Sequence, residues 1–332
     1  MSSALAVDES LTPQHKTDHH KRCPAGLTGP INLPADDAVH AYSPYSLEWF
    51  YYSTHLETDD GEEFGFSQIV YTVLGPGSVP VQYVDATITD HAEAKYHFGG
   101  RQYALGPATV LPNAFEFAIG SERIKGGNGH DVVHSEVVDG PSTYIVDLTL
   151  ESEKTPVLHL ADAYVNYFSR ERMKARGTIS VNGKSHKVHG QSWFDHQFGP
   201  QQIALSTVQN WTWIAAQLRH DRELLALVVK KQDGTEQYIG SYTDEHCNTT
   251  QLGENDFTIA ATGSWTASPG CTYPLGWDVT VPSKGITVHV QPVITNQDIW
   301  VPGADRYYEG DSKVTGSHRG KAFVELYGFC AP

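Results

Sequence analysis

The feature that most constrains this chain is a long succession of short runs in which apolar and polar residues alternate, with Gly, Pro, Asn and Asp between the runs. They follow one another from residue 49 to residue 327, and helical periodicity is nearly absent. Alternation places successive side chains on opposite faces of a strand, and short, regularly spaced strands are typical of antiparallel sandwiches and barrels. The sequence therefore predicts an all-β protein.

The number of strands predicts how many bodies they form. One barrel with so many strands would be too wide for side chains to fill, so two smaller β bodies in tandem are expected in 332 residues. The run Gly-Pro-Gln-Gln at residues 199–202 interrupts the pattern. We therefore expect a flexible arm at residues 1–30, which are polar with scattered prolines, an N-terminal β domain at residues 31–200 and a C-terminal β domain at residues 201–332.

Charge and motifs narrow the partners. The net charge is −16 with histidine neutral, whereas nucleic acids and anionic membrane surfaces select a basic footprint. No apolar run approaches the length of a membrane span, so membrane insertion is not expected. The sequence shows no phosphate-cradling or dinucleotide glycine motif, no Gly-x-Ser-x-Gly elbow and no compact histidine ligand set. We therefore expect no metal, no cofactor and no nucleic-acid partner.

The cysteines and the N-terminus bear on the compartment. The four cysteines lack Cys-x-x-Cys spacing, and free buried thiols are favoured over a Cys247–Cys271 disulfide; they are Cys23, Cys247, Cys271 and Cys330. Residues 1–21 lack the apolar core of a signal peptide, which favours a cytoplasmic location. Acceptor sequons at Asn210 and Asn248 leave a secreted origin as the alternative, if the N-terminus is processed.

A hairpin leads into the densest chemistry of the chain, Gly-Gln-Ser-Trp-Phe-Asp-His-Gln-Phe-Gly at residues 190–199. The dipeptide Asn182-Gly183 between two alternating runs is the strongest short-range hairpin signal. A two-residue turn fixes the register, so the sequence predicts that Arg170 faces Asp195 and that residue 172 faces residue 193. Asp195 and His196 then point to opposite faces unless a bulge intervenes.

Two interpretations of Asp195 follow. In the first it pairs with Arg170 on a solvated strand face, as surface carboxylates commonly do. In the second another part of the chain covers this face, and a carboxyl group beside the Trp193 indole acquires a raised pKa and acts as an acid. The residues alone leave both open.

Several motifs together resemble a known superfamily. They are Trp-Phe-Asp-His-Gln-Phe-Gly at residues 193–199, Leu-Glu-Trp-Phe-Tyr-Tyr at 47–52, Tyr-Tyr-Glu-Gly at 307–310 and Gly-Lys-Ala-Phe-Val-Glu-Leu-Tyr-Gly at 320–328. In this order they resemble the lipocalin-like superfamily of bacterial carotenoid 1,2-hydratases (hydroxyneurosporene synthases), to which kievitone hydratase and lipocalin-like Diels–Alderases are related. The resemblance covers about residues 40–330. It implies two lipocalin-like β-barrel or sandwich domains in series.

The same resemblance suggests where the site lies. Functional Tyr-x-Asp and His-x-Trp pairs of carotenoid hydratases fall on Trp193-x-Asp195 and near Asn166-x-Phe168. The aspartate matches and the other three residues differ, so the resemblance leaves the substrate open. We predict Asp195 as the catalytic acid, with His196 and Glu48 as further catalytic residues.

Aromatic clusters predict the substrate-binding wall. Alternate residues of each cluster share a face, which suits an apolar, polycyclic or isoprenoid-like ligand. The predicted substrate-binding residues are Trp193, Trp49, Tyr52, Tyr164, Asn166, Phe168, Asn210, Trp211 and Trp213. We expect them to line a cleft to which both domains contribute, with Glu48 or Tyr52 within reach of Asp195.

The leading functional hypothesis is a cofactor-independent lyase of the hydratase type, acting on a C=C bond of a hydrophobic isoprenoid-like or polycyclic metabolite. Protonation of a trisubstituted alkene gives a tertiary cation, which a protonated carboxyl group and aromatic faces would suit. Two alternatives remain. One is a pericyclase of natural-product biosynthesis, in which rate comes from orientation of the substrate. The other is a non-catalytic carrier of an apolar metabolite.

Overall fold

The chain is built from β-strands. The computed structural model describes residues 23, 30–40, 46–75, 77–161, 165–199, 206–268 and 270–330, and this part holds two short 3-10 helices and no α-helix. The predicted all-β class is confirmed. The arm predicted at residues 1–30 lies outside the described residues, apart from Cys23 and Pro30. Neither helix is long and apolar enough to cross a membrane.

The elements follow in chain order. They are η1 (Ala35–Asp37), β1 (Ser46–Thr58), β2 (Glu63–Leu74), β3 (Val81–Asp90), β4 (Lys95–Phe98), β5 (Gln102–Leu105), β6 (Phe115–Ile119), β7 (Glu122–Gly126), β8 (His130–Asp139), β9 (Ser142–Ser152), β10 (Val157–Ala161), β11 (Asn166–Val181), β12 (Lys184–Phe198), β13 (Val208–Leu218), β14 (Arg222–Lys231), β15 (Glu236–Thr243), β16 (Thr249–Leu252), β17 (Thr258–Ala267), β18 (Cys271–Val281), η2 (Pro282–Lys284), β19 (Ile286–Pro292), β20 (Asp298–Val301), β21 (Asp305–Gly316) and β22 (Gly320–Tyr327).

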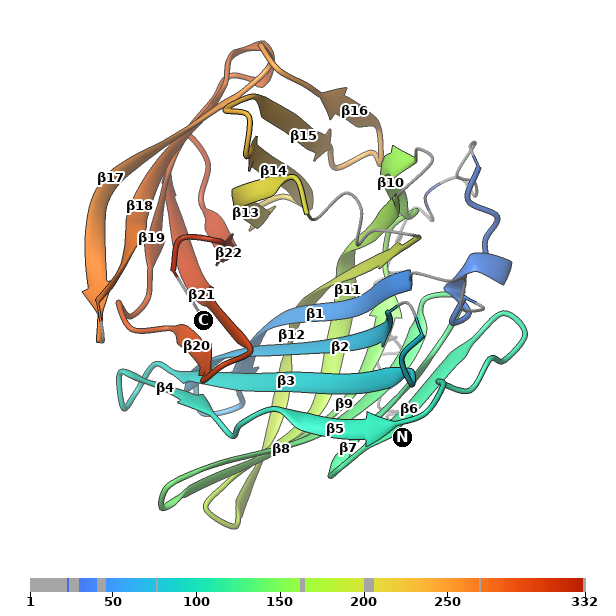
Figure 1. The fold of residues 1–332 in the computed structure, drawn as a ribbon. Helices are drawn as coiled ribbons and strands as arrows, with labels where there is room; N and C mark the ends of the chain where they lie inside the picture. The colour runs from blue at the N-terminus through green and yellow to red at the C-terminus, as the bar shows by residue number, and fades with distance from the viewer. Residues whose placement is uncertain are drawn as a thin grey trace, which may run out of the picture.

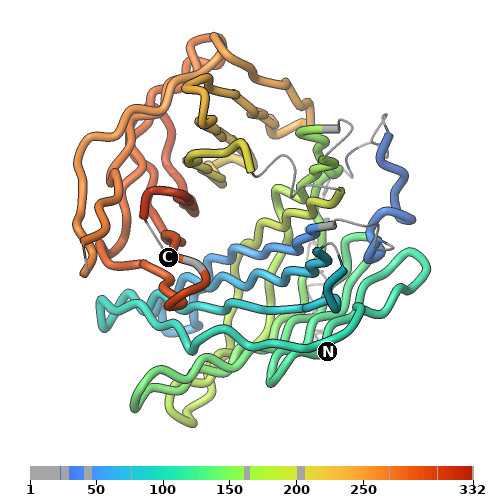
Figure 2. The backbone as a smooth tube through the Cα atoms, in the orientation of Figure 1, coloured from blue at the N-terminus to red at the C-terminus, as the bar shows by residue number. Residues whose placement is uncertain are grey.

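The strands form two curved antiparallel sheets (Figures 1 and 2). The first runs β4-β3-β2-β1-β12-β11-β9-β8-β7-β6, with β10 on β11 and β5 on β3. The second runs β16-β15-β14-β13-β22-β21-β19-β18-β17, with β20 on β21. In the part described, the first sheet ends in sequence at Phe198 and the second begins at Val208. The predicted pair of tandem lipocalin-like β bodies is confirmed, and the predicted boundary at residue 200 falls between these strands.

Three apolar clusters hold the molecule together. One lies inside the first sheet around Phe50 and Phe194, and another lies on the second sheet around Trp277. The third lies between the sheets, where Tyr51 and Trp193 meet side chains of the second sheet such as Trp213. Strand alternation explains the division, because neighbours such as residues 50 and 51 point to opposite faces of β1. Burial of each large apolar side chain stabilises the fold by roughly 1.5–3 kcal/mol.

The hairpin register is right near the turn and wrong at the far end. Asn182 and Gly183 both have positive φ, 51° and 85°, as a type I′ turn requires, and Gly177 pairs with Val188 as predicted. A β-bulge then shifts the pairing between Arg170 and Met173. Because of this extra residue, Asp195 pairs with Ser169, not with Arg170.

The bulge turns Arg170 to the other side of the sheet. Its Nη2 lies 2.6 Å from Oδ1 of Asp37, a buried residue of η1. Residue 172, predicted to face Trp193, lies within the bulge and forms an ion pair with Glu223 of β14. The interpretation of Asp195 as the surface partner of Arg170 is therefore wrong.

The cysteine prediction is also wrong. Cys23 is bonded to Cys247 and Cys271 to Cys330, with Cα–Cα distances of 5.7 and 5.2 Å. Cys247 and Cys271 therefore have different partners, and none of the four thiols is free. The spacing of the cysteines in the sequence could not reveal partners 224 and 59 residues apart. Disulfides persist mainly in oxidising compartments.

Candidate active site

A cavity of about 480 Å³ lies between the two sheets, within the size range of small-molecule sites. Strands of the first sheet form one wall and β13–β15, β21 and β22 form the other. Its aromatic lining consists of Trp49, Tyr51, Tyr71, Tyr83, Tyr167, Trp211, Trp213, Tyr307 and Tyr327. Its aliphatic lining includes Leu47, Ile69, Leu160, Val165, Leu227 and Ile239, and its charged lining consists of Arg101, Asp195, Lys231 and Glu325. A mostly aromatic wall with a few charged groups suits an apolar ligand that one or two polar contacts orient.

Asp195 is buried on the first-sheet wall of this cavity, with 4% of its surface exposed. Its Oδ2 accepts a hydrogen bond from Tyr167 Oη at 2.7 Å. Its Oδ1 accepts bonds from Trp193 Nε1 at 2.6 Å and from the Ser169 hydroxyl. Burial raises the pKa of Asp195 to about 6, and the three donors, which favour the anion, limit the rise.

The strand register explains this arrangement. Tyr167, Ser169 and Asp195 belong to the paired strands β11 and β12, and Trp193 lies two residues before Asp195 on the same face. Trp213 of the second sheet donates from Nε1 to Tyr167 Oη at 3.0 Å. The Asp195 carboxylate is thus connected by hydrogen bonds to both sheets.

Two glutamates of the second sheet face the same region. Glu309 of β21 and Glu325 of β22 are directly opposed in the strand register. Glu309 is fully buried and accepts a hydrogen bond from Tyr51 of the first sheet, while Glu325 accepts one from Trp211 Nε1 at 3.1 Å. Glu325 is half-buried, since one side lines the cavity.

An ion pair closes another part of the wall. Arg101 Nη2 lies 2.5 Å from Oδ2 of the buried Asp85, and the Tyr307 hydroxyl of the second sheet donates to the same oxygen at 2.8 Å. The Arg101 guanidinium lies over the Tyr83 ring at 4.2 Å. This cation is therefore held in place by a carboxylate and a ring, as a rigid part of the wall.

The predicted site residues separate into three groups. Those that line the cavity are Trp49, Asp195, Trp211 and Trp213. Those that do not line it are Trp193, which lies buried behind Asp195, the half-buried Asn166 and Asn210, and Glu48, Tyr52, Phe168 and His196, which face the interior of the first sheet. Tyr164 lies outside the described residues.

The expectation that Glu48 or Tyr52 would reach the cavity is wrong. Tyr52 donates its hydroxyl to Asp131 Oδ2 at 2.9 Å inside the first sheet, and the Glu48 carboxylate lies beside His196 on the same side. Both have the parity of Phe50 on β1, opposite to that of Tyr51 and Trp49.

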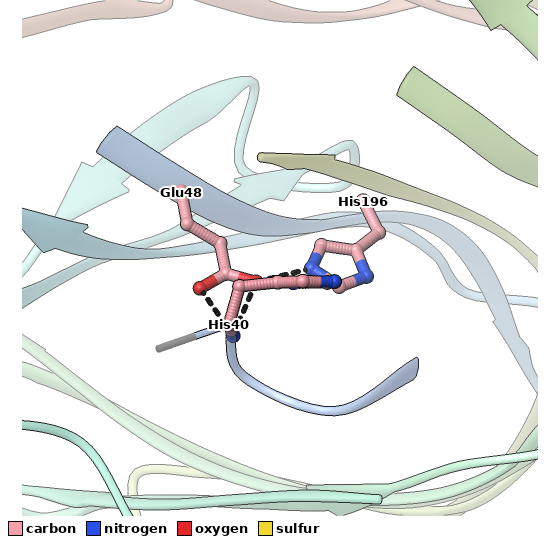
Figure 3. Close-up of side chains that lie close together, drawn as sticks. All are labelled: His40, Glu48 and His196. Carbon is pink, nitrogen blue, oxygen red and sulfur yellow. Dashed lines mark hydrogen bonds and ion pairs between the residues drawn. The ribbon is translucent and has the colours of Figure 1, made fainter. Parts of the chain in front are cut away.

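Figure 3 shows Glu48 between two imidazoles. Its Oε1 lies 2.8 Å from His40 Nδ1 and 2.7 Å from His196 Nε2, and its Oε2 accepts the His40 backbone N–H at 3.1 Å. The potential ligand atoms of these three residues lie within 4.8 Å of one another. In the part of the chain that the structure describes, they form the group that could hold a metal ion. However, His196 Nδ1 has no hydrogen-bond partner among the residues described, whereas a ligating histidine usually donates its second N–H. The geometry is that of a hydrogen-bonded clamp, which fastens residues 36–40 to β1 and β12.

The sequence interpretation missed Glu309 and Glu325 as site residues. One signal was present in the sequence. An aromatic residue stands two positions before each glutamate, Tyr307 before Glu309 and Phe323 before Glu325, as Trp193 stands before Asp195. In a strand, residues two apart share a face, so this spacing places a carboxyl group beside a ring. The pairing of β21 with β22, which brings the two glutamates together, could not be read from either motif alone.

The comparisons with known proteins agree with this architecture. Residues 25–329 match the model of a family described as AttH-like, so the chain belongs to the AttH-like family. This confirms the suspected superfamily. No curated protein matches the sequence.

Two solved structures show the same fold, and a third superposes less well. A crystal structure described as AttH from Nitrosomonas europaea superposes with a TM-score of 0.79 at 17% identity, covering 93% of this chain and 100% of that one. Kievitone hydratase from Nectria haematococca superposes with a TM-score of 0.65 at 18% identity, covering 84% of this chain and 88% of that one. The structure of CghA with Sch210972 gives a TM-score of 0.48 at 10% identity, covering 86% of this chain and 88% of that one.

Proposed function

We propose that the protein is a lyase of the hydratase type, which adds water to, or removes it from, a C=C bond of a hydrophobic metabolite bound between the sheets. The observation that carries the proposal is Asp195, a buried carboxyl group at the wall of an aromatic cavity, with a pKa raised by burial to about 6. Hydration of an alkene requires transfer of a proton to carbon and of a proton from water. A carboxyl group that titrates near neutral pH suits such transfers, and a similar fold in kievitone hydratase supports the choice.

The aromatic lining supports an isoprenoid-like or polycyclic substrate. A tertiary cation would be stabilised by the faces of Trp49, Trp211 and Trp213, because the π face of an indole is electronegative. The cavity volume accommodates one such molecule.

Labelled water tests the class of reaction. We expect a panel of prenylated phenols and linear terpenols, incubated with the protein in oxygen-18 water, to yield an alcohol that carries the label. A cyclised product without label would instead identify a cyclase. Panel members that bind and are recovered unchanged would identify a carrier.

The variant Asp195→Asn tests the residue. We expect it to lower turnover by a factor of about 10² to 10⁴, the range typical of a general acid or base, while the fold and ligand binding persist. Asp147→Asn on the exposed face of β9 is the matched control. Turnover by Asp195→Asn at the wild-type rate would remove Asp195 from the mechanism.

A further inference from the structure

Two carboxyl groups that no described cation neutralises lie together on the second sheet. Glu309 and Glu325 are directly opposed on β21 and β22, a register that brings Cβ atoms to about 4.5–5.5 Å. From the residues that the structure describes, each accepts a single hydrogen bond, Glu309 from Tyr51 and Glu325 from Trp211. Within the described part, Glu309 Oε2 is buried without a partner. Two like charges this close in a buried region cannot both persist, so the pair keeps at least one proton.

The charged groups around the pair strengthen this conclusion. Asp195 faces it from the first sheet, and its negative charge raises the pKa of both glutamates. The cations that line the cavity are Lys231 and Arg101, and neither is among the groups that shift the two pKa values. Burial raises the pKa of Glu325 to about 8 despite the Trp211 hydrogen bond, and burial together with the Glu325 charge raises that of Glu309 well above its usual value.

Of the two glutamates, Glu325 is the one that lines the cavity. It lies opposite Trp213 in the pairing of β13 with β22, and Tyr327 lies two residues further along the same face. A substrate that contacts these rings would therefore lie beside the Glu325 carboxyl group. Glu309 lies beside it on β21 and next to Tyr51.

Glu325 and Asp195 differ in the hydrogen bonds that they accept. Asp195 accepts bonds from Tyr167, Trp193 and Ser169, and three donors stabilise a carboxylate anion. Glu325 accepts one bond and has a carboxyl neighbour. We propose that Glu325, paired with Glu309, is the acid that protonates the substrate, and that Asp195 is the base that takes a proton from water. This inference rests on the proposed hydratase function and assigns the direction of its proton transfers.

The steps balance as follows. The O–H bond of Glu325 breaks, and its proton forms a C–H bond with the alkene, whose π electrons leave the neighbouring carbon as a tertiary cation. A lone pair of water forms a C–O bond with this cation, and the released proton goes to the Asp195 carboxylate. After the alcohol leaves, Asp195 loses the proton to solvent and Glu325 regains one. Dehydration is the reverse.

Infrared spectroscopy tests the proton on the pair without any substrate. In the wild-type protein at pH 7 we expect the carbonyl stretch of a protonated buried carboxyl group, and we expect the component that titrates near pH 8 to be absent from Glu325→Gln. Glu116→Gln on the exposed face of β6 should leave this component in place. A wild-type spectrum without such a component would overturn the inference, whatever the activity of Asp195→Asn.

Activity tests the role of the proton. With the substrate that the labelled-water experiment identifies, turnover by Glu325→Gln should be lower than that of wild type by about 10²-fold or more. A folded Glu325→Gln protein with turnover within about twofold of wild type would overturn the inference, while loss of turnover in Asp195→Asn would still support the hydratase.

Two conservative variants keep the inference testable if Glu325→Gln does not fold. The rate should rise with pH as Asp195 ionises and fall as Glu325 ionises. Trp211→Phe removes the one donor to Glu325, so the falling limb should move to higher pH. Ser169→Ala removes a donor to Asp195, so the rising limb should move to higher pH instead. The opposite assignment of the two shifts would reverse the acid and the base, and so overturn the inference.

Discussion

At the scale of single residues, the surroundings of each carboxyl group decide whether it suits proton transfer or a structural role. Asp195 and Glu325 face the inter-sheet cavity, whereas Glu48 faces the interior of the first sheet and joins His40 to His196. Burial raises the pKa of Glu48, but the hydrogen bonds from the two imidazoles outweigh it and lower the pKa overall. A carboxylate held as an anion by two histidines suits a structural clamp better than proton transfer to a substrate.

Glu48→Gln tests this division. An amide presents an N–H₂ group where the carboxylate accepted bonds, so we expect a loss of about 1–3 kcal/mol in the free energy of unfolding. Turnover per folded molecule should stay within about twofold of wild type. Urea unfolding and a rate assay on the same preparation measure both. Lost turnover with unchanged stability would restore Glu48 to the catalytic role that its sequence neighbourhood suggested.

At the scale of elements, local signals were predictable and long-range ones were not. The Asn182-Gly183 turn and the first part of its hairpin follow from adjacent residues. The bulge at the far end does not, because Arg170 turns toward Asp37, which lies 133 residues earlier. The resemblance located Asp195, but its real partners depend on that bulge.

Gly190 shows how closely the central strands approach. A Cβ atom at this position would collide with the backbone carbonyl oxygen of His55 on β1, which pairs with β12. Because the obstacle is backbone, it cannot move aside as a flexible side chain could. We expect Gly190→Ala to lower the free energy of unfolding by about 1–3 kcal/mol.

The control for this variant is Gly183→Ala in the hairpin turn, where a Cβ meets no atom within 4 Å but φ is 85°. Chemical denaturation of both variants separates steric collision from backbone strain. A Gly190→Ala protein as stable as wild type would mean that β1 and β12 can separate without cost.

At the scale of the whole molecule, the sheets are joined by a buried polar network as well as by rings. Glu223 of the second sheet binds Arg172 of β11 and Lys154 of the loop between β9 and β10, and Ser241 donates to Glu171 Oε1 at 2.7 Å. Burial, followed by the charge of Glu223, raises the pKa of Glu171 to about 7. The interface therefore contains a carboxyl group that titrates near neutral pH.

This shift makes stability fall as the pH rises. In the folded state Glu171 holds its proton up to about pH 7, whereas the ordinary pKa of a glutamate is 4.5, so the folded state binds more protons than the unfolded state between these pH values. The free energy of unfolding must then decrease with pH across that window, and remain level above it. Glu171→Gln removes this contribution. The free energy of unfolding of the variant, relative to that of wild type, should therefore rise by about 1–3 kcal/mol as the pH rises from 4.5 to 7.

Urea unfolding at several pH values measures the difference, with the exposed Glu116→Gln as the control. Parallel stability curves for Glu171→Gln and wild type would show that Glu171 titrates as it does in the unfolded chain.

The two disulfides divide the chain into covalent rings. Cys23–Cys247 closes one around the whole first sheet and β13 to β15 of the second, and Cys271–Cys330 closes another around β18 to β22. A protease cut inside either ring leaves the molecule in one covalent piece. Only a cut at residues 248–270 separates the two rings, and this stretch contains β16 and β17, the two edge strands of the second sheet, with the exposed residues 254–256 between them. That loop is where a single break would divide the protein in two.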